Sequence, residues 1–462
     1  FISGRFSYFS WFLGLANALS KDNYTSNYNF GDWNARYTNQ LNENNKISFS
    51  TYFGNDRFNE KQNQTIQGTN YENHDQLKWG NATMAMRWFN SQQSGLNNNL
   101  TAYFTQYKND IAIQFHEIDS NGVFEVDQAL SSSLKETGVK WHSSLPINKK
   151  HRFNFGSNWA LQLINPGSKN FQFNNGNTDS TYVETELYIA NNLSLYAEDQ
   201  YQLTERLNLG LGVHFNVFSQ KNTQYPSLQP RVTAQYYLTE DLSIQGSYSR
   251  MQQTLHLLSN FGTGAPTNLW VSATDAVKPS QAEQYAFQLS YFIRKWKLKF
   301  DFEAYHKQMT DLITFEDGFN FLKLGNWEEN VVKNGLGEAY GMEFLVSKSF
   351  GRLNGFVGYT YSKTNRKFST INEGQWYPYQ FDRRHDISIV GSLRLKENMR
   401  LNFNWVFSTG NAITLENSVF AYGGSGNAHI NLLGQGTVHN PGPRNWFRME
   451  SSHRLDLGLQ IT

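Results

Sequence analysis

The chain has 462 residues, no cysteine, and 40 basic against 39 acidic side chains, while 16% of its residues are aromatic. The lack of cysteine excludes a disulfide scaffold, a thiolate nucleophile and thiolate metal sites. A net charge of +1 without a long basic run is a poor match for the phosphate backbone of nucleic acid. No apolar run reaches the roughly 18 residues of a membrane-spanning helix, but membrane strands escape that criterion because they alternate.

Alternating hydrophobicity with a period of two residues recurs from one end of the chain to the other. It begins in residues 1–9 and is clear in 207–217, 296–304 and 401–407. In residues 296–304 one phase is wholly apolar, whereas the other consists of lysine, aspartate and glutamate. No stretch shows a comparable 3.6-residue period. The pattern predicts an all-β protein with strands of about 9 to 18 residues, longer than the roughly five or six of an average strand.

Two kinds of connector separate the predicted strands. Short breaks, which fit tight turns, occur at residues 42–45, 91–95, 147–150, 203–206, 238–241, 294–295, 350–352 and 396–398. Long polar connectors are predicted at residues 55–75, 165–181, 252–280, 316–335, 364–380 and 410–452. Short turns at one end of a sheet and long loops at the other are typical of bacterial outer-membrane barrels, whose short turns are periplasmic and long loops extracellular.

The energetic cost of charge in lipid decides which phase faces outward. A Lys or Arg that faces lipid at the bilayer midplane costs about 2–4 kcal/mol. The charged phase of residues 296–304 is therefore predicted to line a wet lumen, and the aromatic side chains to form girdles on the outer wall. We count about 18 strands, with an error of about two. Residues 1–462 are predicted to form one large antiparallel transmembrane β-barrel domain, incomplete at both ends.

Particular motifs, most of them in the second half, go beyond this general pattern. They are residues 1–8 (FISGRFSY), 256–260 (HLLSN), 266–271 (PTNLWV), 277–281 (VKPSQ), 381–386 (FDRRHD), 405–413 (WVFSTGNAI) and 449–457 (MESSHRLDL). In these motifs the chain resembles TonB-dependent outer-membrane receptors of the Bacteroidetes type. The resemblance is strongest from about residue 227 onward.

This resemblance implies a barrel of about 22 strands in the outer membrane of a Gram-negative bacterium. It also implies an N-terminal plug domain, which is not in the chain. The implied function is active uptake, energised through TonB, of a bulky nutrient such as siderophore–iron, haem, cobalamin, a glycan or a peptide. The expected partners are outer-membrane lipid and the TonB complex, with a surface lipoprotein as a further candidate. No cofactor, metal or nucleic acid is expected.

Three charged residues near the start of one predicted strand are candidates for contact with a ligand or with the plug. In residues 381–395 the apolar phase faces lipid, so Asp382, Arg384 and Asp386 are predicted to point inward. The strand descends from a long loop to a short turn, which places the three side chains high in the lumen. The alternative interpretation is a set of lumenal salt bridges that brace the wall.

Aromatic and imidazole side chains in the predicted loops are the other candidates, because aromatic surfaces can stack on sugars or flat chelates. The alternative interpretation is that they close apolar clusters within the loops. These residues are His256, Trp270, Trp327, Trp376, Tyr377, His429, His439 and Trp446.

Enzyme signatures are lacking. The glycine-rich stretches at residues 335–337 and 423–426 are not placed between a strand and a helix, as a phosphate loop requires, and neither HExxH nor GxSxG occurs. The sequence therefore predicts a transporter and no enzyme. Three other interpretations stay open: a passive porin-like channel, a structural or secretion-associated outer-membrane barrel, and a secreted glycan-binding protein built from several sheets.

Overall fold

The computed structural model of the chain describes residues 1–7, 9–19, 23–66, 68–119, 122–175, 178–258, 268–317, 326–421 and 437–461. Within these ranges the main element is one sheet of 20 strands, and every pairing in it is antiparallel. Its long strands pair with their neighbours in chain order, so the sheet is a meander. The predicted all-β class is confirmed, and the strand count agrees with the predicted one.

The strands of the main sheet follow one another along the chain. They are β1 (Ile2–Phe6), β2 (Tyr24–Asn42), β3 (Asn45–Ile66), β4 (Thr69–Ser91), β5 (Asn97–Asp119), β6 (Gly122–Pro146), β7 (His151–Asn174), β8 (Asp179–Glu184), β9 (Tyr188–Gln202), β10 (Leu207–Gln220), β11 (Thr223–Tyr237), β12 (Leu242–Gln253), β15 (Ser280–Ile293), β16 (Leu298–Phe315), β17 (Val331–Lys348), β18 (Leu353–Lys367), β19 (Tyr377–Pro378), β20 (His385–Lys396), β21 (Met399–Ser408) and β26 (Ser452–Ile461).

The remaining elements lie in the connectors. Three small two-stranded sheets pair β13 (Leu255–Leu258) with β14 (Leu269–Ser272), β22 (Ala412–Ile413) with β25 (Phe447–Arg448), and β23 (Glu416–Ala421) with β24 (Thr437–Pro441). The helical segments are α1 (Phe9–Leu19), η1 (Trp327–Glu329) and η2 (Asn372–Gly374). Among the described residues, no helix is long and apolar enough to cross a membrane.

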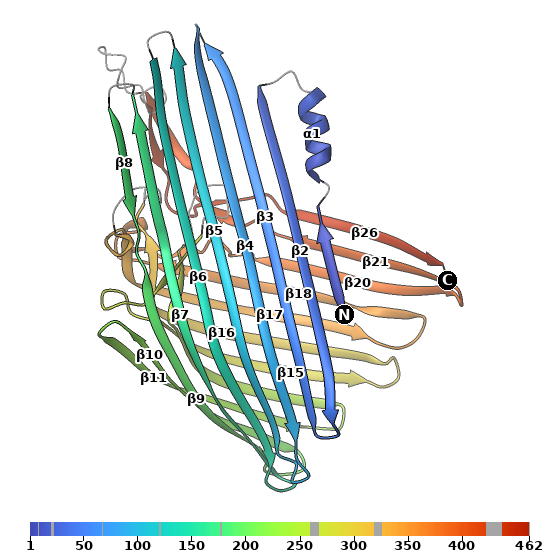
Figure 1. The fold of residues 1–462 in the computed structure, drawn as a ribbon. Coiled ribbons are helices and arrows are strands. Elements are labelled where there is room, and N and C mark those ends of the chain that lie inside the picture. The colour runs from blue at the N-terminus through green and yellow to red at the C-terminus, as the bar shows by residue number, and fades with distance from the viewer. Residues whose placement is uncertain are drawn as a thin grey trace.

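The sheet curves into a wall around a lumen. In Figure 1 the long strands β2–β7 lean across the front, and β15–β26 run behind them at a steep angle. Among the described residues, β1 pairs only with β2, and β26 only with β21. The wall described here therefore has two open edges, one along β1 and one along β26.

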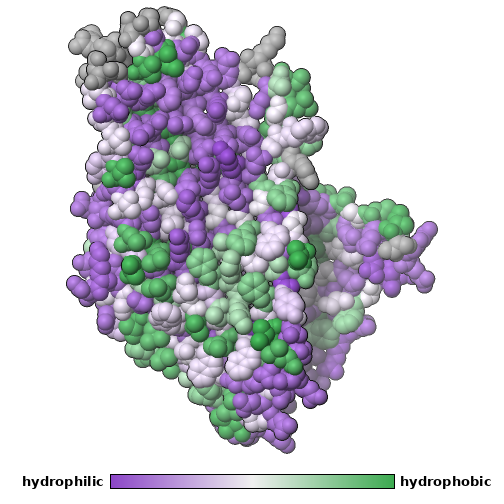
Figure 2. All heavy atoms as spheres, in the orientation of Figure 1, coloured by the Kyte–Doolittle hydropathy of each residue, from purple (hydrophilic) through white to green (hydrophobic). Residues whose placement is uncertain are grey.

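The outer face carries an apolar belt over part of its height. Outward side chains such as Trp33, Phe49, Met86 and Val139 are exposed on β2–β6, as expected for a surface that meets lipid chains. Figure 2 shows that apolar residues gather over the lower part of the β2–β7 wall and that predominantly polar residues lie above them. The upper part of this wall thus extends beyond the belt.

That extension corrects two predicted loops. Residues 55–75 belong largely to β3 and β4, and residues 165–181 largely to β7 and β8. The prediction was wrong because strands that leave the lipid no longer need one apolar face, while their ladder still satisfies the backbone N–H and C=O groups. A polar stretch outside the membrane therefore looks the same in sequence whether it is strand or loop.

Helix α1 (Phe9–Leu19) is a second departure from the prediction, which extended the first strand to Phe9. The segment contains no β-branched residue and is rich in Leu and Ala, which favours a helix. None of its residues is buried, and it contacts β2, where Asn17 Nδ2 donates to the Ser26 carbonyl oxygen at 2.9 Å.

Candidate ligand cavity in the barrel lumen

The connector between β12 and β15 folds into the lumen. Its hairpin β13–β14 crosses to the far side and contacts β6 and β7 of the opposite wall. Leu258 and Val271 of the hairpin pack in one buried cluster with Leu130, Ile164 and Phe218 of the wall. The alternating apolar residues of β14 explain this placement, because they lose contact with water only when they meet the inner wall.

A second connector adds to the same cluster. Trp327 of η1 is buried, and its indole Nε1 donates to the Tyr188 hydroxyl at 3.1 Å. Two connectors from the second half of the chain are thereby fixed to the inner face of β6, β7, β9 and β10. The first of these connectors forms one boundary of a cavity within the lumen.

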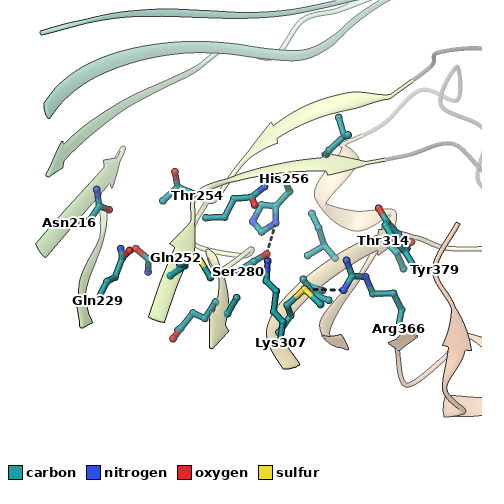
Figure 3. A pocket seen from close by; sticks show the side chains of 18 of the residues that line it. Asn216, Gln229, Gln252, Thr254, His256, Ser280, Lys307, Thr314, Arg366 and Tyr379 are labelled. Carbon is teal, nitrogen blue, oxygen red and sulfur yellow. Dashed lines mark hydrogen bonds between the residues drawn. The ribbon is translucent and has the colours of Figure 1, made fainter. Parts of the chain in front are cut away.

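This cavity has a volume of about 640 Å³, within the usual range for a small-molecule site. Strands β9–β12 contribute residues such as Asn216 and Gln229, and the adjoining part of the wall contributes Lys307 of β16 and Arg366 of β18. His256 of β13 closes it from the hairpin (Figure 3). Figure 3 shows Asn216 and Gln229 at one end of this space, Lys307 near Ser280 in the middle, and Arg366 at the other end.

His256 lies between the hairpin and β15. Its side chain is 5% exposed, and Ser280 Oγ lies 3.1 Å from its Nδ1 atom. Burial lowers the pKa of His256 from its ordinary 6.5 to about 4, while a hydrogen bond with the backbone of Lys278 acts in the opposite direction. His256 is therefore neutral at neutral pH, so it adds a hydrogen-bonding group and no charge to the cavity.

Arg366 is held across the inner face of the sheet. Its guanidinium lies 4.4 Å from the centre of the Tyr379 ring, and Nη1 lies 3.2 Å from the Met309 sulfur on β16. Gly337 of β17 lies between them, and a Cβ atom there would clash with Arg366 Nη1. The glycine thus leaves the guanidinium room to reach over β17 toward β16.

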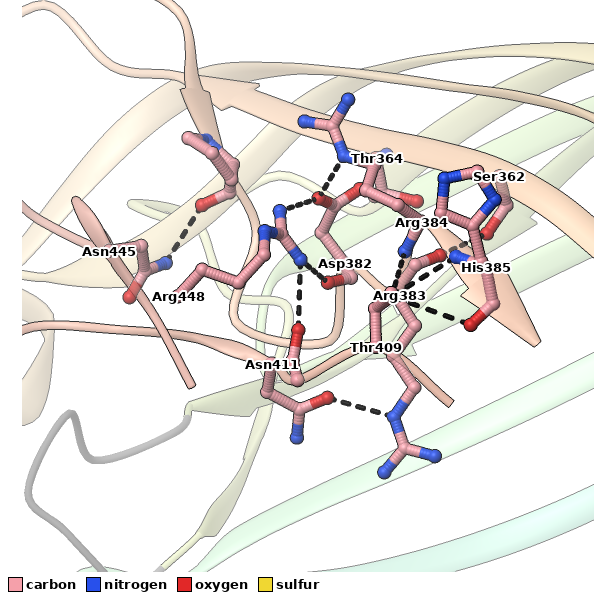
Figure 4. Close-up of polar contacts among 12 residues, drawn as sticks. Ser362, Thr364, Asp382, Arg383, Arg384, His385, Thr409, Asn411, Asn445 and Arg448 are labelled. Atoms are coloured by element: carbon pink, nitrogen blue, oxygen red, sulfur yellow. Dashed lines mark hydrogen bonds and ion pairs between the residues drawn. The ribbon is translucent and has the colours of Figure 1, made fainter. Parts of the chain in front are cut away.

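Asp382, Arg384 and Arg448 form a separate polar cluster, which we call the latch (Figure 4). Asp382 is 1% exposed, and its Oδ2 accepts from Arg384 Nε at 2.8 Å and from Arg448 Nη2 at 2.5 Å. Its Oδ1 accepts the backbone N–H of Thr364 at 2.7 Å. Arg448 Nη1 donates to the carbonyl oxygens of Asp382 and Gly410 at 2.7 and 2.9 Å. The latch therefore joins β18, the segment before β20, and the connector between β21 and β26.

The predicted site residues are divided between these places. His256 and Tyr377 line the cavity, and Asp382 and Arg384 belong to the latch. Asp386 points to the lumen from β20, as its register with Thr360 requires.

The other aromatic candidates do not line the cavity. Trp327 belongs to the buried cluster, and Trp270 is half-buried on β14. Trp376 and Trp446 are exposed, although the indole Nε1 of Trp446 donates to the Leu415 carbonyl oxygen at 3.2 Å. His429 lies outside the described residues, and His439 is on β24.

Sequence reasoning missed most of the polar residues that line the cavity. Strands carry these residues, which are Lys307, Arg366, Asn216 and Gln229, whereas most of the candidates predicted from the sequence lie in predicted loops. These residues belong to the polar phase of their strands, close to the end that joins a long connector, and that position is visible in the sequence. The described ranges contain no group of three His, Asp or Glu side chains placed to hold a metal ion.

Comparison with known proteins gives one family. The chain matches the family model "TonB dependent receptor-like, beta-barrel" over residues 5–460. No curated protein sequence matches it. Among solved structures it is similar to the FpvA receptor of Pseudomonas aeruginosa bound to heterologous pyoverdines, with a TM-score of 0.60 and 12% identity over 95% of this chain and 59% of that one.

Two further solved structures have the same fold. The copper transporter OprC gives a TM-score of 0.57 at 10% identity, over 94% of this chain and 71% of that one. The FrpB iron transporter from Neisseria meningitidis gives 0.57 at 10% identity, over 97% and 76%. At such identities the likeness shows the fold alone, and the chain spans 59% of the length of FpvA.

Proposed function

Because the chain belongs to the TonB-dependent receptor family, whose β-barrel model matches residues 5–460, we propose that it forms the wall of an active nutrient transporter energised through TonB. Its place is the outer membrane of a Gram-negative bacterium, where proteins of this family are found. The family match is the observation that carries the proposal. The lumenal cavity supports it, because connectors that fold inward give the wall a place to hold a solute.

The proposal includes parts that the chain does not contain. A plug domain would close the lumen, and TonB would act on that plug. A surface lipoprotein is a further proposed partner. The motifs at residues 256–281 and 381–386 support a receptor of the Bacteroidetes type. The proposed cargo is a bulky nutrient: siderophore-bound iron, haem, cobalamin, a glycan or a peptide. FpvA bound to pyoverdine, OprC and FrpB support a metal-containing cargo within that set.

The experiment is a growth and uptake comparison with the full-length gene. The gene is deleted in its host, and uptake of ferric siderophores, haem, cobalamin, oligosaccharides and peptides is measured in the deletion strain and in a complemented strain. A tonB deletion in the complemented strain is the matched control. We expect uptake of one of these ligands to need both genes. Uptake that persists without TonB would contradict active transport.

A second measurement separates the transporter from a passive porin with the same wall. The purified full-length protein is inserted into planar lipid bilayers, and its conductance is recorded. A transporter closed by a plug is expected to stay nearly non-conducting. A porin of 16 to 18 strands has a lumen filled with water and is expected to conduct ions. Sustained open conductance would favour the porin.

A further inference from the structure

The cavity in the lumen has an unbalanced charge. Lys307, Arg366 and Arg231 line it, but none of its lining residues is Asp or Glu. Within the described part of the chain, none of these three cations forms an ion pair. Asp317, on a nearby connector, pairs with Arg444 and does not line the cavity. The cavity thus presents positive charge that the wall itself does not neutralise.

The acidic residues of the same strands lie on the outer face or elsewhere along the lumen, outside the lining of the cavity. Glu338 of β17 is on the outer face, where its Oε1 lies 3.1 Å from His306 Nε2. Glu303 and Glu343 face the lumen opposite each other on β16 and β17. Glu303 precedes Lys307 by four residues, a separation of roughly 13 Å along a strand. At that distance across water its attraction is largely screened, so the upper lumen stays positive.

Two of the cations are brought to one place by the strand register. Lys307 lies opposite Ala339 of β17, and Arg366 lies opposite Gly337 of the same strand, two residues away on the same face. The small residues at 337 and 339 leave the surface of β17 clear between them. Arg366 leans over β17 to Met309, which is two residues beyond Lys307 on β16. An ammonium and a guanidinium group therefore border the same space.

The rest of the lining supplies hydrogen-bonding groups. Asn216, Gln229 and Ser280 contribute amides and a hydroxyl. In the described ranges, His214 Nδ1 and Gln252 Oε1 are buried without a hydrogen-bond partner, although both residues line the cavity. Buried polar atoms are rarely left unpaired, because each costs roughly 1–3 kcal/mol. These atoms indicate an occupant that can form hydrogen bonds as well as ion pairs.

We propose that this cavity binds an anionic group, a carboxylate or phosphate of a transported solute, between Lys307 and Arg366, with Arg231 in the same row of the sheet as Lys307, three strands away. This assignment rests on the proposed transport function and names a class of substrate for it. Arg366 would form paired hydrogen bonds with the oxygens of the anion, because a guanidinium matches the geometry of both carboxylate and phosphate. Lys307 would act as a point charge, and the amides would bind the neighbouring polar atoms of the solute.

Calorimetry on the full-length protein in lipid nanodiscs tests this assignment. The probes are citrate for carboxylates, pyrophosphate for phosphates, and glucose as an uncharged solute of comparable size, each titrated at low ionic strength. We expect citrate or pyrophosphate to bind and glucose not to bind. Added salt should weaken binding, because the interaction is electrostatic. The better of the two anions identifies which oxyanion the site prefers.

Variants connect binding to the named residues. Lys307→Gln and Arg366→Gln are each expected to raise the dissociation constant of the anion about 10-fold, because each variant loses a charge-assisted hydrogen bond. Arg366→Lys should retain part of the affinity. The matched control is Lys363→Gln on the opposite face of β18, where the ammonium lies 6.0 Å from the centre of the Tyr340 ring. That variant should bind the anion as the parent protein does.

Three results would overturn the proposal. The first is that neither anion binds, and the second is that both bind equally well to all variants. The third is that the parent protein binds no anion while Lys307→Gln and Arg366→Gln each lower its melting temperature. In that case a carboxylate of the protein itself would occupy the cavity and pair with these cations. TonB-dependent uptake that continues without anion binding would overturn only the cavity assignment. Anion binding in a protein whose uptake ignores TonB would overturn only the transport mechanism.

Discussion

The first half of the wall has longer strands and shorter outer connectors than the second half. Strands β2–β7 are 19 to 25 residues long, and the bounds of β3 and β4 are only three residues apart at their outer ends. Strands β15–β21 of the main sheet, the two-residue β19 aside, are 10 to 18 residues long, and the connectors at their outer ends are long. The first half extends its sheet outward beyond the apolar belt, whereas the second half folds connectors inward.

This difference teaches where the function of such a wall is built. The outward extension satisfies its own backbone in the ladder and needs no tertiary packing above the belt. The inward connectors must bury their apolar residues against the opposite wall, and in doing so they enclose the cavity and form the latch. The residues able to select a solute therefore come from the lumenal phase of β9–β18 and from the connectors.

The largest expected effect concerns the latch of the second half. Asp382→Ala leaves Arg384 and Arg448 without their shared carboxylate in a buried place, so the free energy of unfolding should fall by about 3–5 kcal/mol. Urea titration of the full-length protein folded into lipid vesicles measures this free energy of unfolding. Asp386→Ala, four residues further along the chain on β20, is the control and should change stability by less than about 1 kcal/mol. Equal losses in both variants would show that Asp382 does not hold the connectors together.

The next effect tests the extension of the first half. Val139 and Val123 both point outward from β6, at 42% and 37% exposure. We place Val139 within the belt and Val123 beyond it, at the outer end of the strand. Val139→Arg should therefore cost about 2–4 kcal/mol. Val123→Arg should cost less than about 0.5 kcal/mol. The same vesicle titration compares them, and similar costs at both positions would contradict an extension outside the lipid.

A smaller effect concerns the pH dependence of the hairpin connector. His256 lies on β13, outside the wall strands, and its pKa in the folded protein is about 4 against an ordinary 6.5. Between these values the unfolded chain binds the extra proton, so folding stability should be full above pH 6.5 and decline as the pH falls toward 4, by about 2 kcal/mol at pH 5. His256→Gln should remove this part of the decline. Identical pH profiles for the parent and the variant would refute a buried neutral imidazole.

The sequence predicted the class of fold well because alternation is a direct consequence of one lipid-facing side. The outward phase of residues 207–217 and 401–407 and the inward charges of residues 299–303 lie as the alternation required. Lys297 is an exception, because it belongs to a turn and has a φ of 53°. Prediction failed where lipid no longer constrains the chain. Residues 55–75 are polar on both faces, so their strands could not be distinguished from a loop, and the all-round apolar segment of α1 has no helical stripe.

The site was predicted only in part, for a related reason. Loop aromatics and a loop histidine were selected by residue type, and His256 and Tyr377 do line the cavity. Lys307 and Arg366 could not be singled out, because many strands carry inward charges and only the register across β17 shows that these two share a space. Trp327 was chosen as a loop aromatic, but the fold places its side chain in the buried cluster.

The most direct test of the whole account is a structure of the full-length protein in a lipid nanodisc with citrate or pyrophosphate present. We predict density for the anion between Lys307 and Arg366, and a lipid belt that surrounds Val139 but stops short of Val123. An empty cavity at saturating anion, or lipid along the full length of β6, would contradict the division of the wall into an outward polar extension and an inward ligand-binding half.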